Sequence, residues 1–249
     1  MKFSKYNASG NDFVIFHTFL KESRGELARM LCDRHSGIGA DGLIVLIPHS
    51  EYDFEWEFYN SDGSNAGMCG NGSRAAAHYA FKYKLAKSDM KFLTDAGVIE
   101  ANVDGNEAEV KLTKPKVLDE LIVAEGKKWI LIDTGVPHLV TFVDDLDSFD
   151  KDICKLMRDK FDANVNYAKV DPDRKSIEIR TYERGVEDET LACGTGMAAA
   201  FYAAYKNGDV LDTTSLYPKS KEELRLSLRD DFIYFKGSVE EVFITNIDI

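Results

Sequence analysis

A short glycine-rich motif occurs twice, half a chain length apart, and this repeat restricts the possible folds more than any other feature. The four residues from Cys69 (Cys-Gly-Asn-Gly) and the four from Cys193 (Cys-Gly-Thr-Gly) both precede an alanine-rich run, at an offset of 124 in a chain of 249 residues. Residues 7–14 also match residues 132–140, and the apolar positions 27, 30 and 31 recur at 153, 156 and 157. Three matches in one order predict a duplicated chain.

Each half contains the pattern of an amphipathic helix and of a half-buried strand. Apolar spacing predicts helices at 22–33 and 149–160, the second with Ser148 as N-cap. Aromatic residues alternate with acidic ones from Tyr52 to Phe58, which predicts a strand with one buried face. Ser176–Glu183 alternates in the same way and is the counterpart of that strand in the second half.

The alanine-rich run of the second half predicts the centre of the fold. Met197–Tyr205 is apolar on every side, so it is expected to be a helix buried at the middle of its domain. Many short strands around one such helix indicate an α/β fold made of two pseudo-symmetric copies of an α/β roll. Each copy would be a barrel-like sheet around a central helix, with the active site in the interdomain cleft.

The offset also predicts where the two domains divide. We expect an N-terminal half at 1–115, completed by a C-terminal strand at 240–249, and a second half at 116–239. The stretch 115–121 is the expected linker.

Charge and apolar content exclude several classes of partner. The formal net charge of −12 argues against a nucleic-acid or anionic-membrane surface. The longest apolar run, Met197–Tyr205, is about half of what a bilayer-spanning helix needs. The first residues contain no apolar segment typical of a secretion signal.

Widely spaced cysteines without a Cys-x-x-Cys pair predict reduced thiols, so a cytoplasmic protein is expected.

Cys69 and Cys193 each precede a glycine-rich turn that opens a helix. At a helix N-terminus, unpaired N–H groups and the helix dipole stabilise a thiolate and lower the thiol pKa. The same N–H groups suit a carboxylate ligand. Pseudo-two-fold symmetry would place the two thiols on opposite sides of one carboxylate. One thiolate could then remove an α-proton from one face while the other thiol protonates the opposite face, the pair sharing one proton.

Other interpretations of the cysteines are weaker. A lone cysteine is usually a small buried hydrophobe, and this is the interpretation for Cys32 and Cys154, which lie on the amphipathic helices. The five histidines form no local signature of a cysteine hydrolase, and no nucleotide-binding glycine motif or pyridoxal-phosphate lysine context is present. Neither a metal site nor a cofactor is therefore expected.

Seven segments together resemble the diaminopimelate epimerase family, from the first predicted strand to the last. They are Gly10–Asp12, Cys32–Gly42, Tyr59–Ser64, Met68–Arg74, Pro137–His138, Glu183–Gly185 and Ala192–Gly196. The two cysteine motifs alone would also fit proline-racemase-like proteins, whereas Cys32–Gly42 and Glu183–Gly185 would not.

The resemblance implies roles for individual residues. Cys69 and Cys193 would be the acid–base pair of a cofactor-independent epimerase that interconverts L,L- and meso-diaminopimelate, in lysine and peptidoglycan-precursor synthesis. His138 and Glu183 would tune the pKa values of the cysteines. The substrate-binding residues would be Gly70, Asn71, Gly194 and Thr195 at the α-carboxylate, with Asn11, Asn60, Asn164, Glu183 and Arg184 mostly at the distal end. A bidentate arginine suits the distal carboxylate, and a glutamate suits the distal ammonium.

The family also implies a homodimer, for which the apolar segment Glu241–Ile244 is a candidate contact. The chain departs from the family pattern at three places. Val136 replaces an asparagine, the segment from Glu183 to Cys193 is one residue longer, and Tyr6–Ser9 differs from the common first loop. Two alternatives therefore stay open: a racemase for another amino acid, and a binding module that lost catalysis. The retained thiols argue against the binding module.

Overall fold

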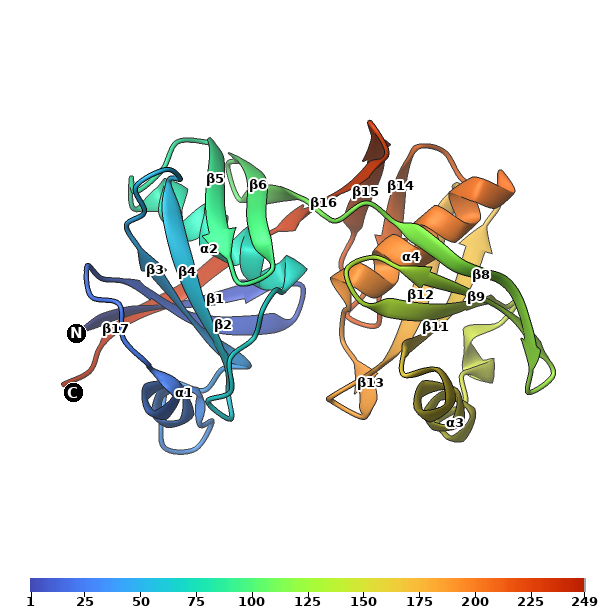
Figure 1. Ribbon diagram of the computed structural model, residues 1–249, viewed down its shortest axis with the longest axis horizontal. Coiled ribbons are helices and arrows are strands. Elements are labelled where there is room, and N and C mark those ends of the chain that lie inside the picture. Colours follow the sequence, from blue (N-terminus) through green and yellow to red (C-terminus); the bar gives the residue numbers. More distant parts are fainter. Residues whose placement is uncertain (249) are drawn as a thin grey trace. The chain divides into compact units, whose positions relative to one another are not determined.

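The computed structural model describes residues 1–248, which form two compact units (Figure 1). The first unit comprises Met1–Val110 together with the C-terminal segment that begins at Lys236, and the second comprises Lys111–Phe235. Ile249, the last residue of the segment expected to complete the first half, lies outside the described residues.

The first unit is one sheet with two helices. Its strands β1 to β4 alternate antiparallel and parallel pairing, and the C-terminal strand β17 pairs antiparallel with β1. The elements are β1 (Lys2–Ala8), β2 (Asn11–His17), α1 (Gly25–Cys32), β3 (Gly42–Ile47), β4 (Phe54–Asn60), α2 (Gly70–Lys82), β5 (Asp89–Thr94), β6 (Gly97–Asp104), β7 (Glu107–Lys111) and β17 (Glu240–Asn246).

The second unit has the same plan. The last strand that it contains is β16 (Phe232–Ser238), whose residues from Lys236 onward belong to the first unit. Its other elements are β8 (Lys116–Ala124), β9 (Lys127–Asp133), β10 (Pro137–Phe142), a 3₁₀ turn (Leu146–Ser148), α3 (Lys151–Phe161), β11 (Asn164–Asp171), β12 (Ser176–Glu183), β13 (Asp188–Thr190), α4 (Gly194–Asn207), β14 (Thr213–Tyr217) and β15 (Leu224–Arg229).

The two units repeat one connection order. In the first, α1 links the parallel strands β2 and β3, and α2 links the parallel strands β4 and β5. In the second, α3 links the parallel pair β10 and β11, and α4 links the parallel pair β12 and β14. A helical crossover is what a parallel pair requires, because its strands cannot be joined by a tight turn. The predicted double α/β roll is therefore confirmed.

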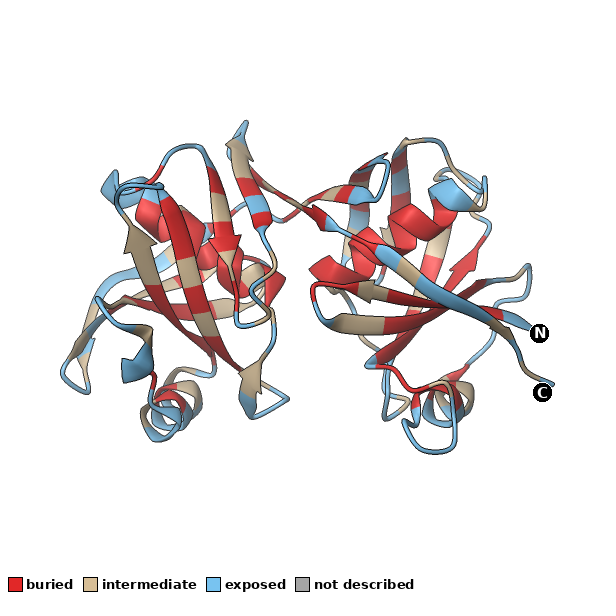
Figure 2. Cartoon of the chain, turned by 180° about the vertical axis from the view of Figure 1, so that it is seen from behind, coloured by how far each residue is buried: buried red, intermediate tan, exposed pale blue. Residues whose placement is uncertain are grey.

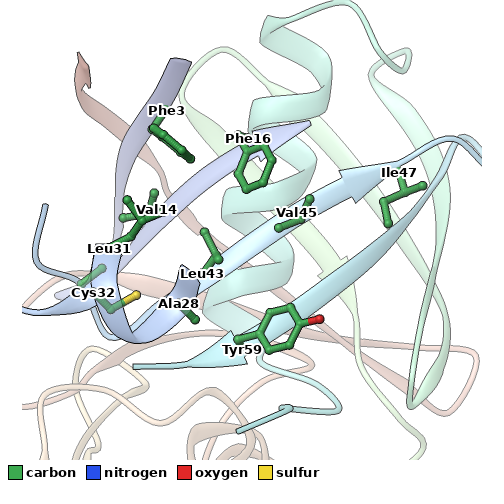
Figure 3. Packing of buried hydrophobic residues seen from close by; sticks show 11 residues of the cluster. Phe3, Val14, Phe16, Ala28, Leu31, Cys32, Leu43, Val45, Ile47 and Tyr59 are labelled. Carbon is green, nitrogen blue, oxygen red and sulfur yellow. The ribbon is translucent and has the colours of Figure 1, made fainter. Parts of the chain in front are cut away.

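The helices α2 and α4 are the buried centre of each unit, as predicted for 197–205 (Figure 2). Alanines at positions 75–77 and 198–200 have no exposed surface, and their small side chains let the sheet close around the helix backbone. The shorter helix α1 covers the outside of the first sheet with Ala28, Leu31 and Cys32 (Figure 3). Cys154 of α3 is likewise in the core of the second unit. The structural interpretation of Cys32 and Cys154 is thus confirmed.

Three local expectations are wrong, the third only in where its strand begins. Ser148 is not the N-cap of α3, because it belongs to the preceding 3₁₀ turn. The cap is Asp150, whose carboxylate accepts hydrogen bonds from the N–H groups of Asp152 at 2.9 Å and Ile153 at 3.1 Å. Residues 115–121 are not an open linker either, since Lys116–Ala124 forms β8 and pairs with β9. The alternation of Tyr52–Phe58 is a strand only from Phe54.

Among residues 1–248, no helix is long and apolar enough to cross a membrane. Within the same range, no group of three or more histidine, cysteine or acidic side chains is arranged to hold a metal ion.

The position of the α3 cap leads to a stability prediction. Asp150→Ala should lower the free energy of unfolding by about 1 kcal/mol, because two helix N–H groups lose their acceptor. Ser148→Ala is the matched control and should cost less than about half of that. Urea unfolding followed by circular dichroism measures both variants, and a larger loss in the Ser148 variant would contradict the assignment of the cap.

Candidate active site

Cys69 occupies the N-cap position of α2, at the end of the first unit's sheet. Its backbone is extended, with φ −146° and ψ 122°, and its sulfur accepts a hydrogen bond from the N–H of Gly72 at 3.4 Å. Asn11, the first residue of β2, lies against the same sulfur, with Oδ1 3.6 Å from Sγ. The thiol therefore has both a backbone donor and an amide acceptor within reach.

The orientation of Asn11 is set by charged side chains behind it. Its Nδ2 donates to the carboxylate of Asp41 at 2.6 Å, so its Oδ1 must face the thiol. Arg34 bonds both Asp41 and Asp12, and Lys5 lies 2.7 Å from Asp12. Burial alone would raise the pKa of Asp12, but the hydrogen bonds from Arg34 and Lys5 outweigh it and lower the pKa to about 2. The cluster therefore holds two paired charges of each sign.

The other first-unit candidates lie around this cluster. Asn60 ends β4 beside the start of β3, and its Nδ2 donates to the hydroxyl of Ser64 at 3.0 Å. Gly70 and Asn71 form the first turn of α2. The side chain of Asn71 accepts from Arg74 at 2.9 Å, so it supports the helix start rather than facing outward.

Cys193 holds the equivalent N-cap position at the start of α4, with φ −123° and ψ 108°. It is 8% exposed, and its sulfur lies 3.6 Å from the hydroxyl of Thr195. The same hydroxyl is 2.9 Å from Nε2 of His138. A continuous row of hydrogen-bonding groups therefore connects the sulfur to the imidazole.

His138 is completely buried near the start of β10. Burial, assisted by the positive charge of Arg184, lowers the pKa of His138 to about 3. The ring is therefore neutral at physiological pH, and it offers one N–H and one lone pair to its neighbours rather than a charge.

Asn164 and Arg184 belong to the same group of side chains. Asn164 starts β11 beside His138, and its Oδ1 accepts from the backbone N–H of Arg184 at 2.8 Å. The guanidinium of Arg184 bonds the carboxylate of Asp162 at 2.9 Å and remains 30% exposed. Glu183 ends β12 immediately before Arg184 and is half-buried.

The structure thus collects the candidate residues into one cluster in each unit. Cys69, Asn11 and Asn60 lie at one end of the first sheet with Gly70 and Asn71. The second cluster consists of Cys193, Gly194, Thr195, His138, Asn164, Glu183 and Arg184. In each unit the cysteine comes from the start of the central helix, and the polar side chains come from the ends of adjacent strands.

Sequence reasoning assigned no role to several side chains that bond these residues. Asp41, Asp12 and Arg34 stood in recognised segments, but their pairing joins positions far apart in the chain. Asn166 was not singled out, although it alternates with Asn164 on the inward face of β11. Two buried polar residues in alternation on a strand are a signal that could have identified it.

The thiols of Cys32 and Cys154 differ from those at the helix starts. Burial raises the pKa of each to about 12, so both stay protonated across the physiological range. They are not candidates for acid–base chemistry.

Comparison with known proteins gives a consistent result. The family model described as diaminopimelate epimerase matches residues 3–118 and 130–242. A protein named diaminopimelate epimerase from Nitratiruptor sp. is 62% identical, covering 98% of both chains. One of that name from Campylobacter lari is 56% identical, covering 98% of this chain and 97% of the other. A crystal structure of a probable proline racemase from Agrobacterium radiobacter has a TM-score of 0.76 at 12% identity, covering 100% of this chain and 93% of that one.

Burial of a neutral His138 predicts how stability depends on pH. The unfolded chain binds a proton at His138 below a pKa of about 6.5, whereas the folded chain does not until about 3. The contribution of neutral His138 to the free energy of unfolding is therefore fully present above pH 6.5. It decreases as pH falls from there to about 3, by at most about 1.4 kcal/mol per pH unit.

Thermal unfolding of wild type and His138→Gln at pH 7.5 to 4.5 tests this expectation. The wild type should lose more stability over that range than the variant, in which the titratable group is missing. His17 and His78, whose pKa values are also lowered by burial, are present in both proteins and cancel. Parallel curves for the two proteins would contradict the neutral buried state.

Proposed function

The chain belongs to the diaminopimelate epimerase family, and we propose that it interconverts L,L- and meso-diaminopimelate through Cys69 and Cys193 without a cofactor. The observation that carries the proposal is that both cysteines occupy the N-cap of the buried central helix, in two units of the same plan. With this activity the protein would act in lysine and peptidoglycan-precursor synthesis, and we propose the cytoplasm as its location. Relatives up to 62% identical bear this name, so we do not favour a racemase for another amino acid.

The proposed chemistry is a proton transfer on each face of one carbon. A thiolate removes the α-proton, so an S–H bond forms, the C–H bond breaks, and the electron pair is delocalised into the α-carboxylate. The second thiol then donates its proton to the opposite face of the carbon and becomes a thiolate. The helix N–H groups at Gly70, Asn71, Gly194 and Thr195 favour the negative charge that grows on the carboxylate. The mechanism therefore requires that both thiols reach the same carbon, one on each face.

The distal end of the substrate carries a carboxylate and an ammonium group. We assign the carboxylate to Arg184, whose partly exposed guanidinium has a planar fork suited to two parallel hydrogen bonds. The exposed carboxylate of Asp162 accepts a hydrogen bond from that guanidinium in the absence of substrate. When the substrate binds, its distal carboxylate would replace Asp162 or bond the guanidinium beside it. Glu183, Asn11, Asn60 and Asn164 are assigned to the remaining polar atoms. Val136 supplies no side-chain hydrogen bond there, so the amides carry that role.

The direct experiment is proton NMR of L,L-diaminopimelate with the reduced protein in D2O, with no cofactor added. The α-proton signal should disappear as the meso isomer forms. Cys69→Ser and Cys193→Ser should each lower turnover by about 10²- to 10⁴-fold, because each removes a general acid or base. Substrate binding, measured by calorimetry, should persist in both variants.

Cys154→Ala is the matched control, because its thiol is buried and protonated. It should keep turnover within about twofold of wild type, since it removes a core sulfur and no reacting group. Epimerisation retained in either helix-start variant would exclude the two-thiol mechanism. Exchange of a different amino acid, with none of diaminopimelate, would instead assign the scaffold to another substrate.

We further propose that the protein is a homodimer that associates through β17. Val242, Phe243 and Ile244 are three consecutive apolar residues on this strand, and each is between 45% and 50% exposed. Such a run on a strand is costly to leave in water and is typical of an interface.

Sedimentation analysis tests the homodimer. The wild type should sediment as a dimer, and Phe243→Lys should shift the population to monomer, because a buried unpaired charge is unfavourable at an apolar interface. Thr213→Lys serves as the charge control, because it adds the same charge at an exposed position of β14 in the second unit. A wild type that sediments as a monomer would contradict the proposal.

A further inference from the structure

We propose that Asn166 is a positioning residue that determines which ring nitrogen of His138 carries the hydrogen, and thereby directs the Thr195 hydroxyl at Cys193. The inference deepens the proposed function, because it assigns a hydrogen-bond direction to one of the two reacting sulfurs. Asn166 itself lies in the middle of β11 with no exposed surface.

The amide of Asn166 has only one possible orientation. Its Nδ2 lies 2.9 Å from the backbone carbonyl of Leu139, which can only accept a hydrogen bond. Its Oδ1 accepts from the hydroxyl of Thr181 at 2.9 Å. Exchanging the nitrogen and oxygen would set two acceptors against each other at Leu139. The NH2 group therefore faces β10.

The second hydrogen of that NH2 group points at the imidazole. Nδ2 of Asn166 lies 3.1 Å from Nδ1 of His138, so Nδ1 must present a lone pair. A neutral ring then carries its hydrogen on Nε2. The acceptor of that hydrogen is the Thr195 hydroxyl at 2.9 Å. The NH2 group of Asn164, 3.4 Å from Nε2, is a donor whose own acceptor is the carbonyl of Pro137 at 3.3 Å.

The direction of the last hydrogen bond follows. Thr195 accepts from His138, and its single hydroxyl hydrogen is left for the sulfur of Cys193 at 3.6 Å. A donor aimed at sulfur stabilises the thiolate relative to the thiol. The positive charge of Arg184 acts on the imidazole and opposes its protonation. The ring therefore stays neutral, with a lone pair on Nδ1 and a hydrogen on Nε2. The row from Asn166 to Cys193 thus favours the basic form of Cys193.

The first unit indicates that this polar row is not required by the fold. Gly196 of α4 packs against His138, Asn166 and Thr181, and a Cβ there would lie 2.4 Å from Oδ1 of Asn166. Gly72 of α2 has the equivalent position, but its neighbours across the sheet are apolar: Phe13 and Ile44, with Phe58 paired to Ile44. Asn166 and Thr181 are paired in the same way across β11 and β12. The first unit thus carries three apolar side chains at the positions where the second unit carries the polar side chains of His138, Asn166 and Thr181.

Nitrogen NMR of ¹⁵N-histidine-labelled protein tests the tautomer directly, without turnover. At pH 7 the wild type should show His138 with hydrogen on Nε2 only, its signals being assigned as those missing from His138→Gln. In Asn166→Asp the carboxylate can only accept, so the hydrogen should move to Nδ1. Thr181→Val removes the bond to Oδ1 and leaves Nδ2 in place, so it should keep the wild-type tautomer.

Kinetics provides the second readout. Asn166→Asp should lower kcat by about ten- to a hundredfold while KM changes by less than about threefold, because ground-state binding is untouched. Asn166→Leu introduces the kind of side chain that the first unit carries, and it should show the same loss of kcat in a folded protein. A wild-type hydrogen on Nδ1, or an unchanged tautomer in Asn166→Asp, would overturn the inference. The NMR result does not depend on the substrate. The tautomer could therefore be tested even if the turnover assay showed no epimerase activity.

Discussion

The start of a helix inside a closed sheet is the constraint on which the rest of each unit depends. The first N–H groups of a helix have no partner within the helix, and in α2 and α4 they lie in the buried centre of the unit. Polar side chains are therefore favoured over apolar ones at the neighbouring strand ends. This explains why β2, β4, β10, β11 and β12 all carry polar or charged residues at the end nearest the helix start. In each unit some of these groups also reach the sulfur at the helix start, Asn11 at Cys69 and Thr195 at Cys193.

The two units meet this requirement with different chemistry. Around Cys69 the amide of Asn11 is oriented by a carboxylate, and ion pairs with Arg34 stand behind it. Around Cys193 the partners are a hydroxyl and a neutral imidazole. Duplication therefore preserved the backbone and not the electrostatics. A symmetric fold with unlike surroundings is suited to a reaction in which one sulfur takes a proton while the other gives one.

The sequence was sufficient for the features that short-range patterns encode. The duplication, the buried helix after Cys193 and the structural role of Cys32 follow from spacing along the chain. The N-cap of α3 was misplaced because Ser148 and Asp150 are both good caps, and spacing along the chain does not distinguish them. In the structure Ser148 belongs to the 3₁₀ turn, and Asp150 accepts from two N–H groups of the helix.

The interactions that orient the site were beyond sequence reasoning for a different reason. Asn11 and Asp41 are thirty residues apart, and Asn166 of β11 contacts His138 of the adjacent strand β10. Such pairs depend on the register of neighbouring strands, which the alternation of one strand does not contain. The linker was misjudged in a similar way, because the pairing of β8 with β9 is decided by the partner strand.

The pairing of β17 with β1 has a consequence for biosynthesis. The first unit contains both ends of the chain, since the strand beside β1 comes from residues 240–246. The second unit is one uninterrupted segment. A ribosome that releases the chain from its N-terminus therefore delivers all of the second unit before the last strand of the first. The half that is synthesised first is the half that is completed last, and a chain stopped before residue 240 leaves β1 paired with β2 alone.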